Sequence, residues 1–168
     1  MIVVCPLHKV ASVVEDHAPS HAISLLGDDH EMPTIPSLAA GNHLKLSFND
    51  ISVPMDGYVA PGEADVKTLV NFIRGWERQA PLLIHCWAGV SRSTAAAYIA
   101  QCLLAPEEDE LTLARNLRAA SPSATPNKLM VIHADLLLGR GGRMADAVAA
   151  IGRGADAWEG NVFQLSVS

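Results

Sequence analysis

Positive charge is scarce in this 168-residue chain. Lysine and arginine together number 12, against 18 aspartate and glutamate residues, so the formal net charge is −6 with histidine neutral. The basic residues are scattered singly, with no two adjacent. Surfaces that bind nucleic acids or acidic membranes normally gather lysine and arginine into a patch or stripe. The charge pattern therefore argues against a nucleic-acid partner and against a membrane partner.

Cysteine is scarce as well. The chain has three, Cys5, Cys86 and Cys102, an odd number at irregular spacing. This pattern is untypical of a disulfide framework and favours a reducing compartment. The segment 1–6 has no basic residue, and its apolar run is too short for a signal peptide. We therefore expect a cytoplasmic protein.

Long apolar runs are missing too. Between Gln79 and Pro106 the single charge is Arg92. It divides this stretch into pieces of about 13 or 14 residues, shorter than the roughly 18 to 20 that a membrane-spanning helix needs. The stretch therefore favours a buried strand, a turn and a buried helix.

The composition is that of a folded chain with a large core, since 49% of the residues are hydrophobic and 18% are charged. Strand and helix patterns alternate in the first half, and helical patterns dominate after Ala88. We predict one α/β domain over residues 1–168, with a single small central sheet, mostly parallel, flanked by helices, and a helical C-terminal half. Strands are expected at 2–5, 22–26, 43–48 and 81–86, and helices at 7–15, 63–79, 91–104, 106–119, 126–138 and 143–151.

The most informative segment is His85–Ser93, which reads HCWAGVSRS. It places a cysteine at the end of a predicted buried strand and an arginine at the start of a predicted helix, with a turn that bends at Gly89. Backbone N–H groups of such a turn and the helix N-terminus can hold a dianion. The same positive potential favours the thiolate form of Cys86 and so a nucleophile at neutral pH. The planar guanidinium of Arg92 can bind two phosphoryl oxygens.

The pattern His-Cys-x5-Arg-Ser resembles the signature of the cysteine-dependent protein tyrosine phosphatases, in particular the compact dual-specificity-like branch with its bacterial members. The resemblance covers roughly residues 43–139, and we treat 140–168 as a C-terminal helical extension of the same domain. It implies hydrolysis of phosphate monoesters through a phosphocysteine intermediate, with Cys86 as nucleophile. The expected substrate-binding residues are Trp87, Ala88, Gly89, Val90, Ser91 and Arg92.

The resemblance also implies a general acid, an aspartate on a loop roughly thirty residues before the cysteine. Asp50 follows a predicted strand in the sequence Phe-Asn-Asp, and Asp56 lies beside Gly57 in a loop. We favour Asp50, because the end of a strand fixes a catalytic group better than the middle of a loop. The larger tyrosine-specific phosphatases carry Trp-Pro-Asp at this place, which this sequence lacks.

Several neighbours have two interpretations. By resemblance, Ser93 donates its hydroxyl to the Cys86 sulfur; alternatively it caps the helix. His85 orders the loop or is a core histidine. Trp87, with Met55 and Tyr58, walls a pocket for an aromatic ring or packs in the core.

Three other features are assigned no chemistry. Pro126-Asn127 resembles a Pro-Asn pair in the family's later helices, where we expect a structural role. Cys102 is interpreted as a buried thiol, with a reversible disulfide to the nucleophile as the alternative. His17, His21, His30 and His43 lie near carboxylates but lack ligand spacing, so we expect no metal and no cofactor.

The predicted function is therefore a phosphoprotein phosphatase acting on phosphotyrosine, extending to phosphoserine and phosphothreonine. The uncharged loop disfavours multiply phosphorylated inositides, and the acidic chain predicts a bias against substrates with flanking Asp or Glu. A lipid, sugar or RNA-end phosphatase would share the motif, and a small phosphomonoester is the alternative substrate. A rhodanese-type sulfurtransferase and a non-catalytic phosphate-binding module are further alternatives.

Overall fold

A five-stranded sheet forms the centre of the computed structural model, which describes residues 1–167. Its strands are β1 (Ile2–Pro6), β2 (His21–Leu26), β3 (His43–Ser47), β4 (Leu82–Cys86) and β5 (Phe163–Leu165), in the order β3-β2-β4-β1-β5. The first four run parallel, and β5 pairs antiparallel with β1. Every residue of β4 is buried, as its continuous apolar sequence predicts for a central parallel strand. The α/β class with one mostly parallel sheet is confirmed.

The parallel direction decides where the loops meet. Carboxyl ends of parallel strands lie at one edge of the sheet, and ligands bind outside that edge in open α/β sheets. The segments that leave it are 27–42 after β2, 48–62 after β3 and 87–91 after β4. The predicted phosphate loop and the predicted acid loop therefore start from the same edge.

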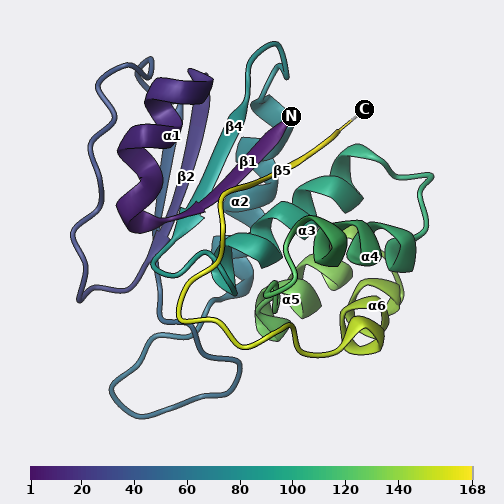
Figure 1. The fold of residues 1–168 in the computed structure, drawn as a ribbon. Coiled ribbons are helices and arrows are strands. Elements are labelled where there is room, and N and C mark those ends of the chain that lie inside the picture. The colour runs from purple at the N-terminus through teal and green to yellow at the C-terminus, as the bar shows by residue number, and fades with distance from the viewer. Residues whose placement is uncertain (168) are drawn as a thin grey trace.

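Helices cover both faces of the sheet (Figure 1). On one face, α1 (Val10–His17) follows the 3-10 turn Leu7–Lys9 and packs on Val3, Cys5 and Leu83. The other face carries α2 (Glu63–Gly75), α3 (Arg92–Leu104), α4 (Glu110–Ala120), α5 (Lys128–Leu138) and α6 (Arg143–Ile151). Helix α3 is buried from its first residue to Cys102, which its four alanines permit because small side chains allow close approach.

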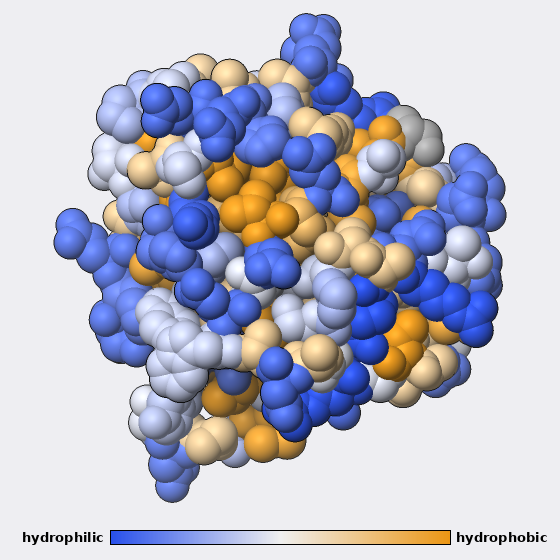
Figure 2. All heavy atoms as spheres, viewed as in Figure 1, coloured by the Kyte–Doolittle hydropathy of each residue, from blue (hydrophilic) through white to orange (hydrophobic). Residues whose placement is uncertain are grey.

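The outer surface mixes residue types. On the face drawn in Figure 2, hydrophobic residues gather near the middle, over the region of the sheet, and hydrophilic residues surround them. Among residues 1–167, no helix combines the length and the apolarity needed to cross a bilayer.

Most boundaries lie within three residues of the sequence prediction, and the larger differences are in α2, in α4 and in the C-terminal extension. Helix α2 ends at Gly75, because Trp76 is extended and its indole donates to the Ala80 carbonyl. Helix α4 begins at Glu110, where the Asp109 side chain accepts from the amide of Thr112 and caps it. In the extension predicted to be helical over 140–168, α6 is the one helix among the described residues 140–167. Residues 163–165 return to the sheet as β5, a strand too short to show a period in the sequence.

A buried ion pair connects α6 to the rest of the helical layer. The Glu110 Oε1 atom lies 3.0 Å from Arg140 Nη1 and 3.1 Å from Arg143 Nε. Arg140 also donates to the Cys102 carbonyl. Burial by itself would raise the pKa of Glu110, but hydrogen bonds from Arg143 and Arg140 lower it below its ordinary value.

We predict that Glu110→Gln lowers the free energy of unfolding by about 3 kcal/mol, because removing one partner of a buried pair leaves the arginine charge uncompensated. Chemical denaturation followed by circular dichroism measures the change. The control is Asp156→Asn, which breaks the exposed pair with Arg153 and should cost less than about 0.5 kcal/mol. Equal losses in the two variants would contradict the role of the buried pair.

Candidate active site

The phosphate loop, residues 86–92, connects the central strand β4 to the central helix α3. Its bend falls at Gly89, whose φ is +71°. A Cβ atom at this position would lie 2.9 Å from the backbone nitrogen of Pro6, so no larger residue fits without moving β1. The bend brings the Gly89 amide within 3.3 Å of the Cys86 sulfur and the Ser93 hydroxyl within 3.2 Å of it. The sulfur therefore lies beside the first turn of α3, where the helix dipole is positive.

The predicted acid loop, residues 48–62 after β3, orients the Arg92 side chain. Its Nη1 atom donates to the Phe48 carbonyl at 2.9 Å, and the side chain is buried. Its Nε atom has no hydrogen-bond partner among the described residues. A buried guanidinium donor without a partner is costly unless an anion accepts from it. Arg92 can thus bind an oxyanion above the Cys86 sulfur.

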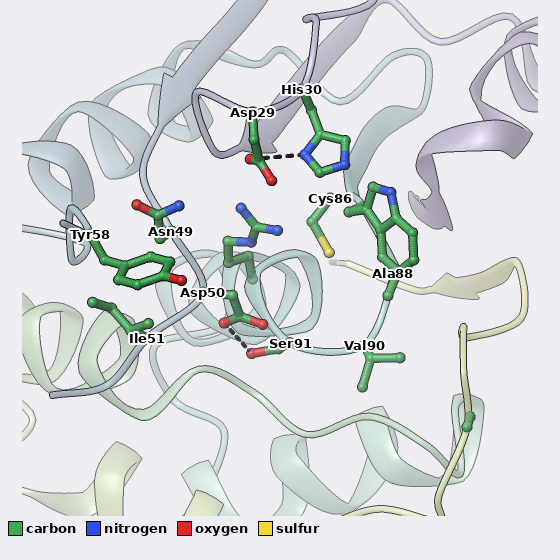
Figure 3. A pocket seen from close by; sticks show the side chains of 13 residues that line it. Asp29, His30, Asn49, Asp50, Ile51, Tyr58, Cys86, Ala88, Val90 and Ser91 are labelled. Carbon is green, nitrogen blue, oxygen red and sulfur yellow. Dashed lines mark hydrogen bonds and ion pairs between the residues drawn. The ribbon is translucent and has the colours of Figure 1, made fainter. Parts of the chain in front are cut away.

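Asp50 lines the same pocket as Cys86 and Arg92 (Figure 3). Its Oδ1 atom accepts hydrogen bonds from the Ser91 hydroxyl at 2.7 Å and from the Asn127 amide at 2.8 Å. The acid loop is therefore tied to the phosphate loop and to the start of α5. Asp56 is exposed and does not line the pocket.

Asn127 has more contacts than the expected structural role requires. Its Oδ1 atom accepts from the Met130 amide at 3.1 Å and caps α5, while its Nδ2 atom donates to Asp50 and to the Ile51 carbonyl. The capping half of this role has a signal in the sequence, because asparagine before a helix is a common N-cap. The contact with Asp50 joins residues 77 positions apart, and no local pattern indicates it.

Behind the loop, a chain of hydrogen bonds crosses three strands. His85 Nδ1 lies 3.3 Å from the Cys86 carbonyl, and its Nε2 lies 2.6 Å from the Ser24 hydroxyl, which contacts His43 Nε2 at 2.8 Å. Because a carbonyl can only accept, Nδ1 carries the proton and Nε2 accepts from Ser24. Burial lowers the pKa of His85 from 6.5 to about 4, so the ring is neutral at pH 7. His85 thus orients the backbone of Cys86 and lies outside the pocket.

The pocket has a volume of about 430 Å³. Among the predicted site residues, it is lined by Asp50, Cys86, Trp87, Ala88, Val90, Ser91 and Arg92. Gly89, Ser93 and His85 lie behind this lining. Tyr58 lines the pocket, whereas Met55, proposed beside it, does not.

Other lining residues come from distant segments and were not predicted from the sequence. Asp29 and His30 come from the loop after β2, and Ala157 comes from the segment after α6. The Asp29 carboxylate lies 3.0 Å from His30 Nδ1, and this contact lowers the pKa of Asp29 below its ordinary value. These segments have no motif, and they reach the site only through the topology of the sheet.

Cys102 lies ten residues after Arg92 on the same helix, roughly 15 Å along its axis at 1.5 Å per residue. Burial raises the pKa of its thiol to about 12. The structure therefore favours the buried-thiol interpretation over a disulfide with Cys86.

Within residues 1–167, no group of three or more His, Cys, Asp or Glu side chains could hold a metal ion.

A pH dependence of stability follows from the buried imidazole. Because the pKa of His85 is lower in the folded protein than in the unfolded chain, its contribution is present above pH 6.5 and is lost as the pH falls towards 4. We expect chemical denaturation to show the free energy of unfolding falling over this interval. The variant His85→Gln, which cannot titrate, should show a shallower fall, and an equally steep fall would contradict a neutral buried ring.

By sequence, the chain matches no family model and no curated protein. Solved structures do match it over most of its length. Human DUSP28 has a TM-score of 0.61 at 14% identity, covering 90% of this chain and 95% of that protein. The Yvh1 phosphatase domain from Chaetomium thermophilum has a TM-score of 0.61 at 18% identity, covering 85% and 93%. PTPMT1 in complex with PI(5)P has a TM-score of 0.60 at 13% identity, covering 84% and 94%.

The TM-scores of 0.60 and 0.61 show that this chain shares its fold with the three structures, although the sequence identities are low. This chain has the fold of the cysteine-dependent protein tyrosine phosphatases, in the compact form of the dual-specificity branch.

Proposed function

We propose that this protein is a cysteine-dependent phosphatase that hydrolyses phosphate monoesters. The observation that carries the proposal is the convergence of three groups in one pocket. The Cys86 sulfur, the Arg92 guanidinium and the Asp50 carboxylate all line it, although they come from the end of β4, the start of α3 and the loop after β3. A nucleophile, an anion-binding cation and an acid are the parts that a two-step hydrolysis needs.

In the first step, the Cys86 thiolate attacks phosphorus and forms the P–S bond while the P–O bond to the leaving group breaks. Asp50 gives its proton to the departing oxygen. Arg92 and the amides of the phosphate loop hold the three remaining phosphoryl oxygens, whose charge grows in the transition state. These groups supply the stabilisation that a metal ion supplies elsewhere, so we propose a metal-independent reaction.

In the second step, water attacks phosphorus and the P–S bond breaks. The proton of the water passes to the Asp50 carboxylate, which now acts as a base, and inorganic phosphate leaves. Ser93, 3.2 Å from the sulfur, donates a hydrogen bond to the departing thiolate. The enzyme returns to its starting protonation state.

We propose a phosphoprotein substrate, with phosphotyrosine first and phosphoserine or phosphothreonine as further substrates. The charges around the pocket favour a substrate with a single phosphate. Arg92 is the only Lys or Arg among the lining residues, and Asp29 and Asp50 also line the pocket. A second phosphate would meet carboxylates and no further cation. PTPMT1, which has a related fold, was crystallised with PI(5)P, so a phosphorylated lipid is the second candidate.

All three cysteines are free, in keeping with the cytoplasmic location that we propose.

Turnover of p-nitrophenyl phosphate tests the proposal. We expect wild-type protein to release nitrophenol at an unchanged rate in EDTA, and Cys86→Ser to abolish release because the nucleophile is lost. The matched control is Cys102→Ser, the same replacement at a buried thiol outside the pocket, which should keep most of the rate. Activity that survives Cys86→Ser, or that chelation removes, would refute the mechanism, and no turnover at all would favour a phosphate-binding module.

The acid is tested separately with phenyl phosphate, whose poor leaving group depends on protonation. We expect Asp50→Asn to lower kcat by about 10² to 10³ on this substrate. The loss should be smaller on p-nitrophenyl phosphate, and the alkaline limb of the bell-shaped pH–rate profile should disappear. Asp56→Asn should change kcat less than twofold, and the opposite order of the two variants would assign the acid to Asp56.

A further inference from the structure

Residues 154–160, the C-terminal segment, lie against the phosphate loop. The Gly160 amide donates to the Ala88 carbonyl at 2.8 Å. A Cβ atom at Gly160 would lie 2.7 Å from the Gly89 carbonyl oxygen, so the two backbones touch where no side chain fits. Figure 3 shows this segment, in pale yellow, passing the side of the pocket where Ala88 and Val90 are labelled.

The C-terminal segment is fixed on both sides of this contact. Before it, the amide of Ala155 donates to the Pro122 carbonyl at 2.9 Å, and the amide of Gly154 donates to the Thr125 hydroxyl at 3.1 Å. After it, β5 pairs with β1. The side chains of residues 157–159 are therefore held beside the pocket by backbone contacts at each end.

This attachment places a second indole at the mouth of the site. Ala157 lines the pocket, and the ring of Trp158 lies edge to face with that of Trp87, with centroids 6.1 Å apart. Trp158 is 85% exposed and Trp87 is 41% exposed, so neither serves the core. Two adjacent exposed indoles on a fixed backbone provide an aromatic surface for a ligand.

The charges near this surface are mainly acidic. Asp29 and Asp50 line the pocket, and Asp156 and Glu159 flank Ala157 and Trp158 in the sequence. Asp156 Oδ1 lies 2.6 Å from Arg153 Nη2 and Glu159 Oε2 lies 3.2 Å from His8 Nδ1, and residues 154–160 contain no Lys or Arg. Arg92 is committed to the phosphate. A cation is the group that both the indole faces and the carboxylates attract.

We propose that Trp87 and Trp158 form a subsite for a lysine or arginine side chain that lies close to the phosphorylated residue of a phosphoprotein substrate. The subsite deepens the phosphatase function proposed above and rests on it. The phosphate binds Arg92 and the loop amides, while the flanking cation stacks on the indoles. Specificity thus depends on Trp158, from the segment after α6, as well as on Trp87 within the nine-residue motif.

Two phosphotyrosine peptides test this directly, one with lysine and one with Nε-acetyl-lysine at the same flanking position, scanned over three residues on each side. Acetylation removes the charge and keeps the four-carbon stem of the side chain. We expect the lysine peptide to have a kcat/KM about three- to fivefold higher at one or more positions. In Trp158→Ala this ratio should fall to about one, and in Trp158→Phe part of it should return. The matched control is Leu136→Ala, which removes another exposed apolar side chain on α5 and should leave the ratio unchanged.

Binding to Cys86→Ser, measured as dissociation constants for the same peptides, separates this proposal from the proposed function. A lysine preference in binding without turnover by wild-type protein would refute the phosphatase and keep the subsite. Turnover with equal ratios in wild type and Trp158→Ala would keep the phosphatase and refute the subsite. Faster hydrolysis of the acetylated peptide than of the lysine peptide would show an apolar subsite and overturn the proposal. Faster hydrolysis of a phospholipid monoester in mixed micelles than of any peptide would overturn it as well.

Discussion

A sharp turn between the central strand and the central helix is the constraint on which the rest of the structure depends. Gly89 adopts a positive φ with its α-carbon against the backbone of Pro6, and its amide points towards the Cys86 sulfur. Because the sulfur lies beside the first turn of α3, that helix must start at the edge of the sheet and run through the core, which explains its alanines. The positive potential comes from backbone dipoles, so the phosphate binding that we propose needs one arginine even in an acidic chain.

The acid loop and the phosphate loop are coupled to each other as well as to the sheet. Arg92 donates to the carbonyl of Phe48, and Ser91 donates to Asp50, so each loop orients a reactive group of the other. Asn127 adds the start of α5 to the same network. Such mutual contacts fix catalytic groups more firmly than a loop by itself does. The site is therefore assembled from two strand ends and two helix starts.

The two faces of the phosphate loop have different neighbours. On the inner side, His85, Ser24 and His43 join the loop to β2 and β3 through buried hydrogen bonds. On the outer side, the C-terminal segment contacts the loop through the Gly160 amide and continues into β5. The chain thus returns, after the helical layer, to β1, the strand next to β4. This return brings Ala157, which is remote from the motif in the sequence, into the lining of the pocket.

The sequence by itself determined the fold class and most of the elements, and it predicted the chemistry of the segment from His85 to Ser93, because strand and helix periods and the backbone bend are local properties. It narrowed the acid to two aspartates but could not choose by geometry, since their distance from Cys86 depends on the path of a loop. Only the tertiary structure joined Asn127 to Asp50 and brought Trp158 against Trp87. Those contacts join residues 77 and 71 positions apart in the sequence. They depend on the parallel order of the strands and on the return of β5 to the sheet, and no local sequence pattern encodes either feature.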